Sequence, residues 1–91
     1  MIFPKVQNME SSKGNLLPNQ FIIWIGKNSY FQSYGSLIVK INHKTGKIYL
    51  DKNKWDYSQT TGKYRNQFLN ETTKETKDKI KSGEYKLINL N

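Results

Sequence analysis

Apolar side chains in the middle of the chain follow the two-residue period of β-strands. Residues 21–25, FIIWI, form a short apolar run that ends at Gly26, which is typical of a buried strand, and we expect it to be central in a sheet. In residues 36–42, SLIVKIN, apolar and polar positions alternate. Residues 43–46, HKTG, have turn composition, and residues 47–51 resume the alternation. The pattern predicts a hairpin.

A helical period follows this hairpin. Large side chains recur there every three or four residues and would share one side of a helix over residues 58–69. Gly62 lies inside this segment and costs the helix about 1 kcal/mol relative to alanine, which does not change the expectation. The side chains of that face are Tyr57, Thr61, Tyr64 and Phe68, with Leu69 beside them.

Capping residues mark a second helix. Thr72 and Glu75 have the spacing of a capping box, and Gly83 stands where a C-cap glycine belongs, so we expect a helix over residues 73–82. Residues 84–90 alternate again and predict a strand that rejoins the sheet.

These elements predict an α+β fold. We expect a small antiparallel sheet of three to four strands with two helices on one face. Residues 20–91 would form a single α+β domain. Residues 1–19 contain prolines, serines and a glycine and lack a continuous apolar run, so we expect a loosely ordered N-terminal arm there.

Composition indicates the size of the core and the cellular compartment. The 91 residues suffice for one small core, and the aromatic content of 13% compensates for an apolar fraction of only 35%. The absence of cysteine suits a reducing compartment, and the cytoplasm is the expected location. No apolar run is long enough to cross a bilayer, so we expect no membrane partner.

Positive charge is concentrated in one segment. The net charge is +8, and residues 40–65 hold seven bases against two acids, which is +5 of that total. Such a balance favours polyanions, chiefly nucleic acid or a ribonucleoprotein. The bias toward lysine and asparagine is also what an AT-rich genome produces without selection for binding, and both interpretations stay open.

Residues that carry chemistry are scarce. The single histidine, His43, lies in the predicted turn beside Lys44, where a solvated residue is far commoner than a catalytic base. The seven acids are scattered and do not have the spacing of metal ligands, and no glycine-rich phosphate loop is present. We therefore expect a protein that is not an enzyme and has no metal site and no cofactor.

The segment WDYSQTTGKYRNQF, residues 55–68, combines aromatic and basic side chains. In a structural interpretation the aromatics close the sheet against the first helix and fill the core. In a functional interpretation lysines surround a partly exposed aromatic and form a stacking platform for phosphate-bearing partners. Both can hold at once. The candidate residues for partner or nucleic-acid binding are Lys44, Lys47, Lys52, Lys54, Trp55, Lys63, Arg65, Tyr30 and Tyr34.

Three of these candidates have more specific expectations. Arg65 is the chain's one arginine and could make a forked contact to phosphate or carboxylate, or an internal ion pair with Asp56 or Glu71. Tyr30 and Tyr34 would share one face of an extended strand, opposite Phe31.

The motifs TGKxYL and WDYSxTTxKYRxQFL, followed by an ETxxxI helix, support a comparison with known families. Over residues 34–91 the sequence resembles a family of small proteins encoded by phages and other mobile elements; the resemblance does not reach residues 1–33. It implies a small cytoplasmic protein made inside a bacterial host. Such proteins are often inhibitors of host enzymes, anti-CRISPR proteins among them.

Three functions follow as hypotheses. The leading one is a non-enzymatic accessory protein that binds and inhibits a host protein or ribonucleoprotein complex, such as a CRISPR effector with its guide RNA. The alternative is a direct single-stranded RNA- or DNA-binding module. The third is a self-assembling structural phage component.

Overall fold

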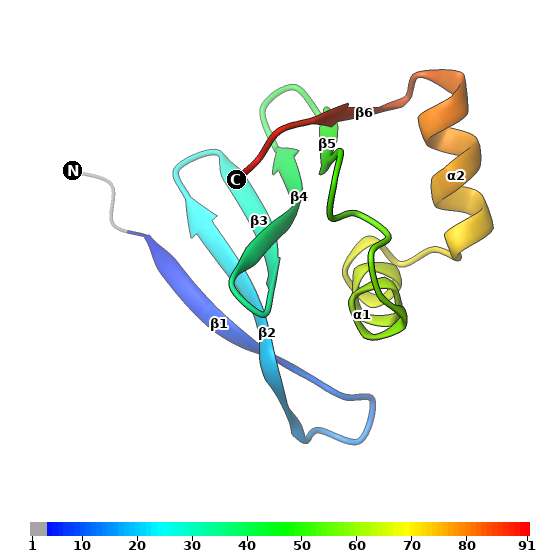
Figure 1. The fold of residues 1–91 in the computed structure, drawn as a ribbon. Coiled ribbons are helices and arrows are strands. Elements are labelled where there is room, and N and C mark those ends of the chain that lie inside the picture. Colours follow the sequence, from blue (N-terminus) through cyan, green and yellow to red (C-terminus); the bar gives the residue numbers. More distant parts are fainter. Residues whose placement is uncertain (1–3) are drawn as a thin grey trace.

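The computed structural model describes residues 4–91 as a six-stranded mixed β-sheet with two helices (Figure 1). The strands lie in the sheet in the order in which they occur along the chain. The elements are β1 (Lys5–Glu10), β2 (Leu16–Ile25), β3 (Asn28–Ser33), β4 (Ser36–Asn42), β5 (Ile48–Asp51), α1 (Gln59–Leu69), α2 (Thr73–Ser82) and β6 (Tyr85–Ile88).

The expected antiparallel sheet of three to four strands is wrong, although the α+β class holds. β1 to β5 are antiparallel neighbours, but β6 runs parallel to β5. The reason is the connection, because α1 and α2 lie between the two strands and return the chain to the end of the sheet where β5 began.

The N-terminal segment departs from the loosely ordered arm that we expected over residues 1–19. Residues 1–3 lie outside the described residues, whereas β1 and the first part of β2 form a long hairpin. Its loop closes through hydrogen bonds at Ser11 and a left-handed Gly14 with φ +81°. Backbone pairing with β2 orders β1, which the polar composition of this segment does not reveal.

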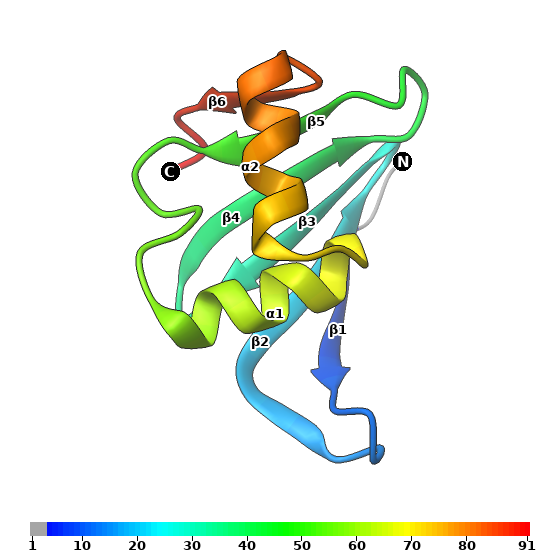
Figure 2. The same cartoon turned by 90° about the vertical axis from the view of Figure 1, so that its right-hand side faces the viewer.

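Both helices cover the same face of the sheet, as predicted (Figure 2). α1 packs on β3, where the Phe68 ring stacks on Phe31 at a centroid distance of 5.7 Å. Beside this pair the Ser33 and Thr61 hydroxyls share a hydrogen bond of 2.9 Å. α2 packs against β6. The buried apolar core is formed by Met9, Leu17, Phe31, Ile38, Val39, Leu50 and Tyr85.

The local signals in the second half of the chain are confirmed. The hairpin of β4 and β5 and both helices lie where the pattern placed them. Ser58 caps α1 by accepting from the Thr61 amide, Thr72 and Glu75 form the capping box of α2, and Gly83 ends that helix with φ +88°.

Among residues 4–91, no helix lies on the opposite side of the sheet, and we call that side the open face (Figures 1 and 2). Alternate residues of β2 point there, so the run at residues 21–25 is less buried than we expected: Phe21 and Ile23 are half-buried and Ile25 is exposed. β2 does lie inside the sheet, between β1 and β3. The C-terminal residues reach across to β4, where the Asn91 side chain makes two hydrogen bonds to the Leu37 backbone.

A buried carboxylate joins α2 to the sheet. The Glu71 side chain is 4% exposed and accepts hydrogen bonds from Thr76, Lys79 and Tyr85, at 2.8 Å from the lysine and 2.7 Å from the tyrosine. Burial raises the pKa of Glu71, but these three donors, Lys79 first, outweigh burial and lower it below the ordinary value of 4.5. Burial and the adjacent carboxylate raise the pKa of Tyr85 to about 12, so the hydroxyl stays a donor.

The variant Glu71→Gln is expected to lower the free energy of unfolding by about 2–3 kcal/mol at pH 7, because it leaves Lys79 and Tyr85 without their anionic partner. A carboxyl whose pKa is lowered by folding stabilises the protein above its unfolded-state pKa and loses that contribution as the pH falls through the folded-state pKa. The difference between the two proteins should therefore be complete at neutral pH and narrow below pH 4.5. Urea denaturation at several pH values measures it.

Glu84→Gln is the matched control, since Glu84 is exposed on the connection to β6 and accepts no ion pair within residues 4–91. A loss that persists unchanged at pH 3 would contradict the role of the Glu71 charge.

Candidate binding surface on the open face

The fold distributes the predicted site residues over separate parts of the molecule. Two lie in the β4–β5 turn, three in or beside the loop that follows β5, two on α1, and two at or near the end of β3. In the same order they are Lys44 and Lys47; Lys52, Lys54 and Trp55; Lys63 and Arg65; and Tyr30 and Tyr34. They do not form the single basic–aromatic surface that the linear sequence suggested.

Arg65 is the largest departure, because its side chain is 0% exposed. Its Nη1 atom donates to the Trp55 carbonyl and pairs with Asp56 Oδ1 at 3.1 Å. The internal ion pair with Asp56 is therefore the correct alternative, and Arg65 is not available to a partner.

The other half of the guanidinium reaches the connection between the helices. Nη2 donates to Asn66 Oδ1 at 3.0 Å and to Thr73 Oγ1 at 2.9 Å, and the group lies over the Trp55 ring, 5.1 Å from its centroid. One buried cation thus joins the loop after β5, helix α1 and the first residue of α2.

The remaining bases near α1 lie against tyrosines. Lys54 Nζ is 5.0 Å from the centroid of the Tyr57 ring, and Lys63 Nζ is 5.4 Å from that of Tyr64. Trp55 and Tyr64 also pack against the core, as the structural interpretation of residues 55–68 proposed. This part of the surface keeps positive charge, but its best-buried aromatics serve the fold.

Tyr34 does not share a strand face with Tyr30. β3 ends at Ser33, and Tyr34 occupies the turn with a left-handed φ of +58°, followed by Gly35 at +111°. Its ring is 55% exposed, whereas Tyr30 lies half-buried on the open face.

The register of the sheet creates a row that crosses the open face. Tyr30 in β3 pairs with Lys40 in β4, Lys40 pairs with Tyr49 in β5, and Tyr49 pairs with Lys86 in β6. Neighbouring strands are about 4.8 Å apart, so the four side chains are consecutive and alternate aromatic with basic. We call Tyr30, Lys40, Tyr49 and Lys86 the tyrosine–lysine row.

The two lysines of this row have no acidic partner within residues 4–91. None of the ion pairs within residues 4–91 involves Lys40 or Lys86, and Lys40 Nζ lies 5.7 Å from the Tyr49 ring centroid. Asp51, the acid on the same side of β5, is buried and accepts hydrogen bonds from the Asn53 and Leu90 backbone amides. Burial raises the pKa of Asp51, but these hydrogen bonds outweigh it and lower the pKa.

A hollow of about 520 Å³ adjoins the row. Tyr30 and Lys40 contribute to its wall, and the rest is mainly apolar and comes from β2, β3, β4, the end of β6 and the residues that follow it. These further residues are Ile23, Ile25, Gln32, Leu37, Ile88, Asn89 and Leu90. The open face therefore offers rings, cations and an apolar depression side by side.

Three members of the row, Lys40, Tyr49 and Lys86, were missed as site residues. Lys40 and Tyr49 occupy alternating positions of the predicted hairpin, so its pattern could have placed them on one face. Lys86 could not have been found this way, because the pairing of β6 with β5 depends on a connection through two helices.

A family model for proteins of unknown function, DUF8033, matches residues 4–84. The chain belongs to the DUF8033 family. The match includes β1 to β3, so the N-terminal hairpin, which the resemblance over residues 34–91 left out, is part of the DUF8033 domain. No curated protein and no solved structure matches this DUF8033 chain. Within residues 4–91, no helix is long and apolar enough to span a bilayer.

Arg65→Lys is expected to lower the free energy of unfolding by about 2–4 kcal/mol, because an ammonium group cannot reproduce the forked contacts to the loop and to Thr73. Urea denaturation followed by tryptophan fluorescence measures the loss. Lys63→Ala, an exposed position on the same helix, should change stability by less than about 0.5 kcal/mol. Equal effects of the two variants would contradict the structural role of Arg65.

Proposed function

We propose that this protein is a non-enzymatic module that binds single-stranded nucleic acid on its open face. The observation that carries this proposal is the tyrosine–lysine row, in which aromatic rings alternate across four adjacent strands with lysines that have no ion-pair partner among residues 4–91. Proteins that bind single strands combine stacking rings with cations that follow the backbone.

Charge complementarity selects this occupant of the open face. The protein carries a net charge of +8, and in the part of the chain that the structure describes the bases of the row have no acidic partner. An apolar protein segment would leave Lys40 and Lys86 desolvated and unpaired, which costs free energy, whereas phosphates would neutralise them. The apolar hollow beside Tyr30 suits an unstacked base.

The row also favours single strands over duplexes. Bases in a duplex are stacked on each other, so rings that project from a sheet cannot reach their faces. Bases of a single strand can turn outward and stack on Tyr30 and Tyr49. Discrimination by sequence is expected to be weak, because every base offers an aromatic face.

The biological setting remains a prediction. The resemblance over residues 34–91 implies a phage or mobile-element protein in the cytoplasm of a bacterial host, acting on a ribonucleoprotein such as a CRISPR effector. A module that binds single strands would contact exposed guide RNA or displaced DNA in such a complex. The basic open face supports this more readily than mimicry of nucleic acid, which requires acidic surfaces.

Binding of a fluorescent single-stranded oligonucleotide, oligo(dT) or oligo(U), tests the proposal by anisotropy. The double variant Lys40→Gln/Lys86→Gln should weaken binding and reduce the slope of log K against log salt by about 1.4, since each phosphate contact in a single strand contributes about 0.7. Tyr49→Ala should weaken binding about 5- to 150-fold, the effect of losing one base–aromatic stack.

Two control variants match these changes elsewhere on the molecule. Lys77→Gln/Lys81→Gln removes the same charge from exposed positions of α2, and Tyr57→Ala removes an exposed ring beside α1. Both control variants should retain most of the affinity for the oligonucleotide. Tyr57→Ala should also leave the slope of log K against log salt unchanged. If the row variants and their controls lose the same affinity, the interaction depends on net charge and not on the row. If the protein binds no oligonucleotide at low salt, the proposed function is wrong and an inhibitor that binds a host protein is favoured. A defined oligomer that binds neither nucleic acid nor a host protein would favour a self-assembling structural phage component.

A further inference from the structure

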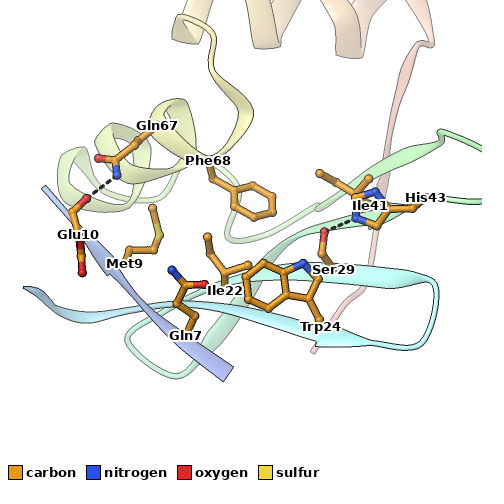
Figure 3. Close-up of a pocket in the computed structure, with 10 residues that line it drawn as sticks. All are labelled: Gln7, Met9, Glu10, Ile22, Trp24, Ser29, Ile41, His43, Gln67 and Phe68. Atoms are coloured by element: carbon orange, nitrogen blue, oxygen red, sulfur yellow. Dashed lines mark hydrogen bonds between the residues drawn. The ribbon is translucent and has the colours of Figure 1, made fainter. Parts of the chain in front are cut away.

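A second cavity lies on the helix-covered side of the sheet, between the β1–β2 hairpin and α1 (Figure 3). Its volume of about 390 Å³ is at the small end of ligand pockets and leaves room for a ring system. In Figure 3, Phe68 of α1 lies on one side of the hollow and Trp24 and Ile22 lie on the other. The half-buried rings of Phe68 and Trp24 border a hollow that stays open to solvent, although closer approach of the helix would bury them.

A serine–histidine pair forms one polar end of this cavity. Ser29, only 3% exposed, shares a hydrogen bond of 2.8 Å with Nε2 of His43. In either tautomer, one ring nitrogen or the serine hydroxyl retains hydrogen-bonding capacity for a ligand. Figure 3 shows the bond beside the Trp24 ring.

Gln7 forms the second polar end. It is exposed on β1, and in Figure 3 its side-chain amide points toward the hollow. This amide offers a donor and an acceptor. By contrast, the Gln67 amide is occupied, because its Nε2 donates to the Glu10 carbonyl at 2.7 Å.

The residues that line the cavity do not suit a ligand held mainly by a phosphate group. None of the residues that line the cavity is lysine or arginine, although the chain has fifteen such residues. The Glu10 carboxylate points away from the aromatic rings in Figure 3, so Glu10 contributes its backbone there. The cavity therefore fits an uncharged ligand.

We infer that this cavity binds an uncharged planar heteroaromatic ring, the chemistry of a nucleobase. The ring lies between Phe68 and Trp24, and its edges hydrogen-bond to Gln7 and to the Ser29–His43 pair. Trp24 and Ser29 alternate along their strands with Ile23 and Tyr30, which point to the open face. The cavity is thus separate from the tyrosine–lysine row, and the inference does not depend on the proposed function.

Titration of the ¹⁵N-labelled protein with adenosine, guanosine, cytidine and uridine tests the inference by NMR. At least one nucleoside should shift the amide signals of Gln7, Trp24 and Phe68. Its 5′-monophosphate should bind no more than about twofold tighter, because no cation lines the cavity. Repeating the titration with oligo(U) shows whether the base can come from a nucleic-acid strand or only from a free nucleoside. Shifts of the same amides with oligo(U) indicate a base of a nucleic-acid strand, and shifts with nucleosides alone indicate a free ligand.

Gln7→Ala and His43→Ala should each weaken nucleoside binding about 3- to 10-fold, the effect of one hydrogen bond. Both residues are exposed, so their thermal unfolding should show that the fold is retained. Gln59→Ala, at an exposed position of α1 outside both the cavity lining and the open face, is the matched control and should leave the affinity unchanged. The inference is wrong if no nucleoside shifts the cavity amides at millimolar concentration, if shifts map to Tyr30 and Tyr49, or if Gln59→Ala matches Gln7→Ala.

Discussion

The buried Arg65 guanidinium is the constraint on which the helical layer depends. It lies where three segments meet: the loop after β5, the middle of α1 and the start of α2. α1 has few large apolar side chains, and α2 has only Ile80, so apolar burial alone positions both helices weakly. A forked, permanently charged group can fix several polar partners at once in a way that lysine cannot. The same contacts explain why a sole arginine in a lysine-rich chain is inside the protein.

The helical layer in turn determines which face of the sheet stays available. α1 and α2 are short, and both are tied to one side by Arg65, by the Glu71 cluster and by the Phe31–Phe68 stack. The six strands nevertheless carry large side chains on both sides. Half-buried rings and isoleucines therefore remain on the uncovered side, and exposed apolar patches commonly mark binding surfaces.

Local features of the fold were predictable from the sequence, and features that depend on distant partners were not. Caps, the β4–β5 hairpin and both helices follow from residues close together in the chain, such as Ser58, Thr72 and Gly83. The direction of β6 could have been predicted from the two helices that precede it, because parallel strands are joined by long crossover connections. β1 had none, because backbone pairing rather than apolar pattern orders it. For Arg65, sequence left an internal pair and an external contact equally open, and only packing decides between them.

One register serves both candidate binding regions. β2 and β3 present Ile23 and Tyr30 to the open face, and the next pair, Trp24 and Ser29, to the cavity beneath α1. A shift of one residue would exchange these sets and would place a tyrosine under the helix and a serine in the row. The cross-strand pairing that builds the fold is therefore also what separates an aromatic surface that carries lysines from a hollow whose lining has none. Because the two differ in charge, the ligands proposed for them differ in chemistry even though adjacent residues form them.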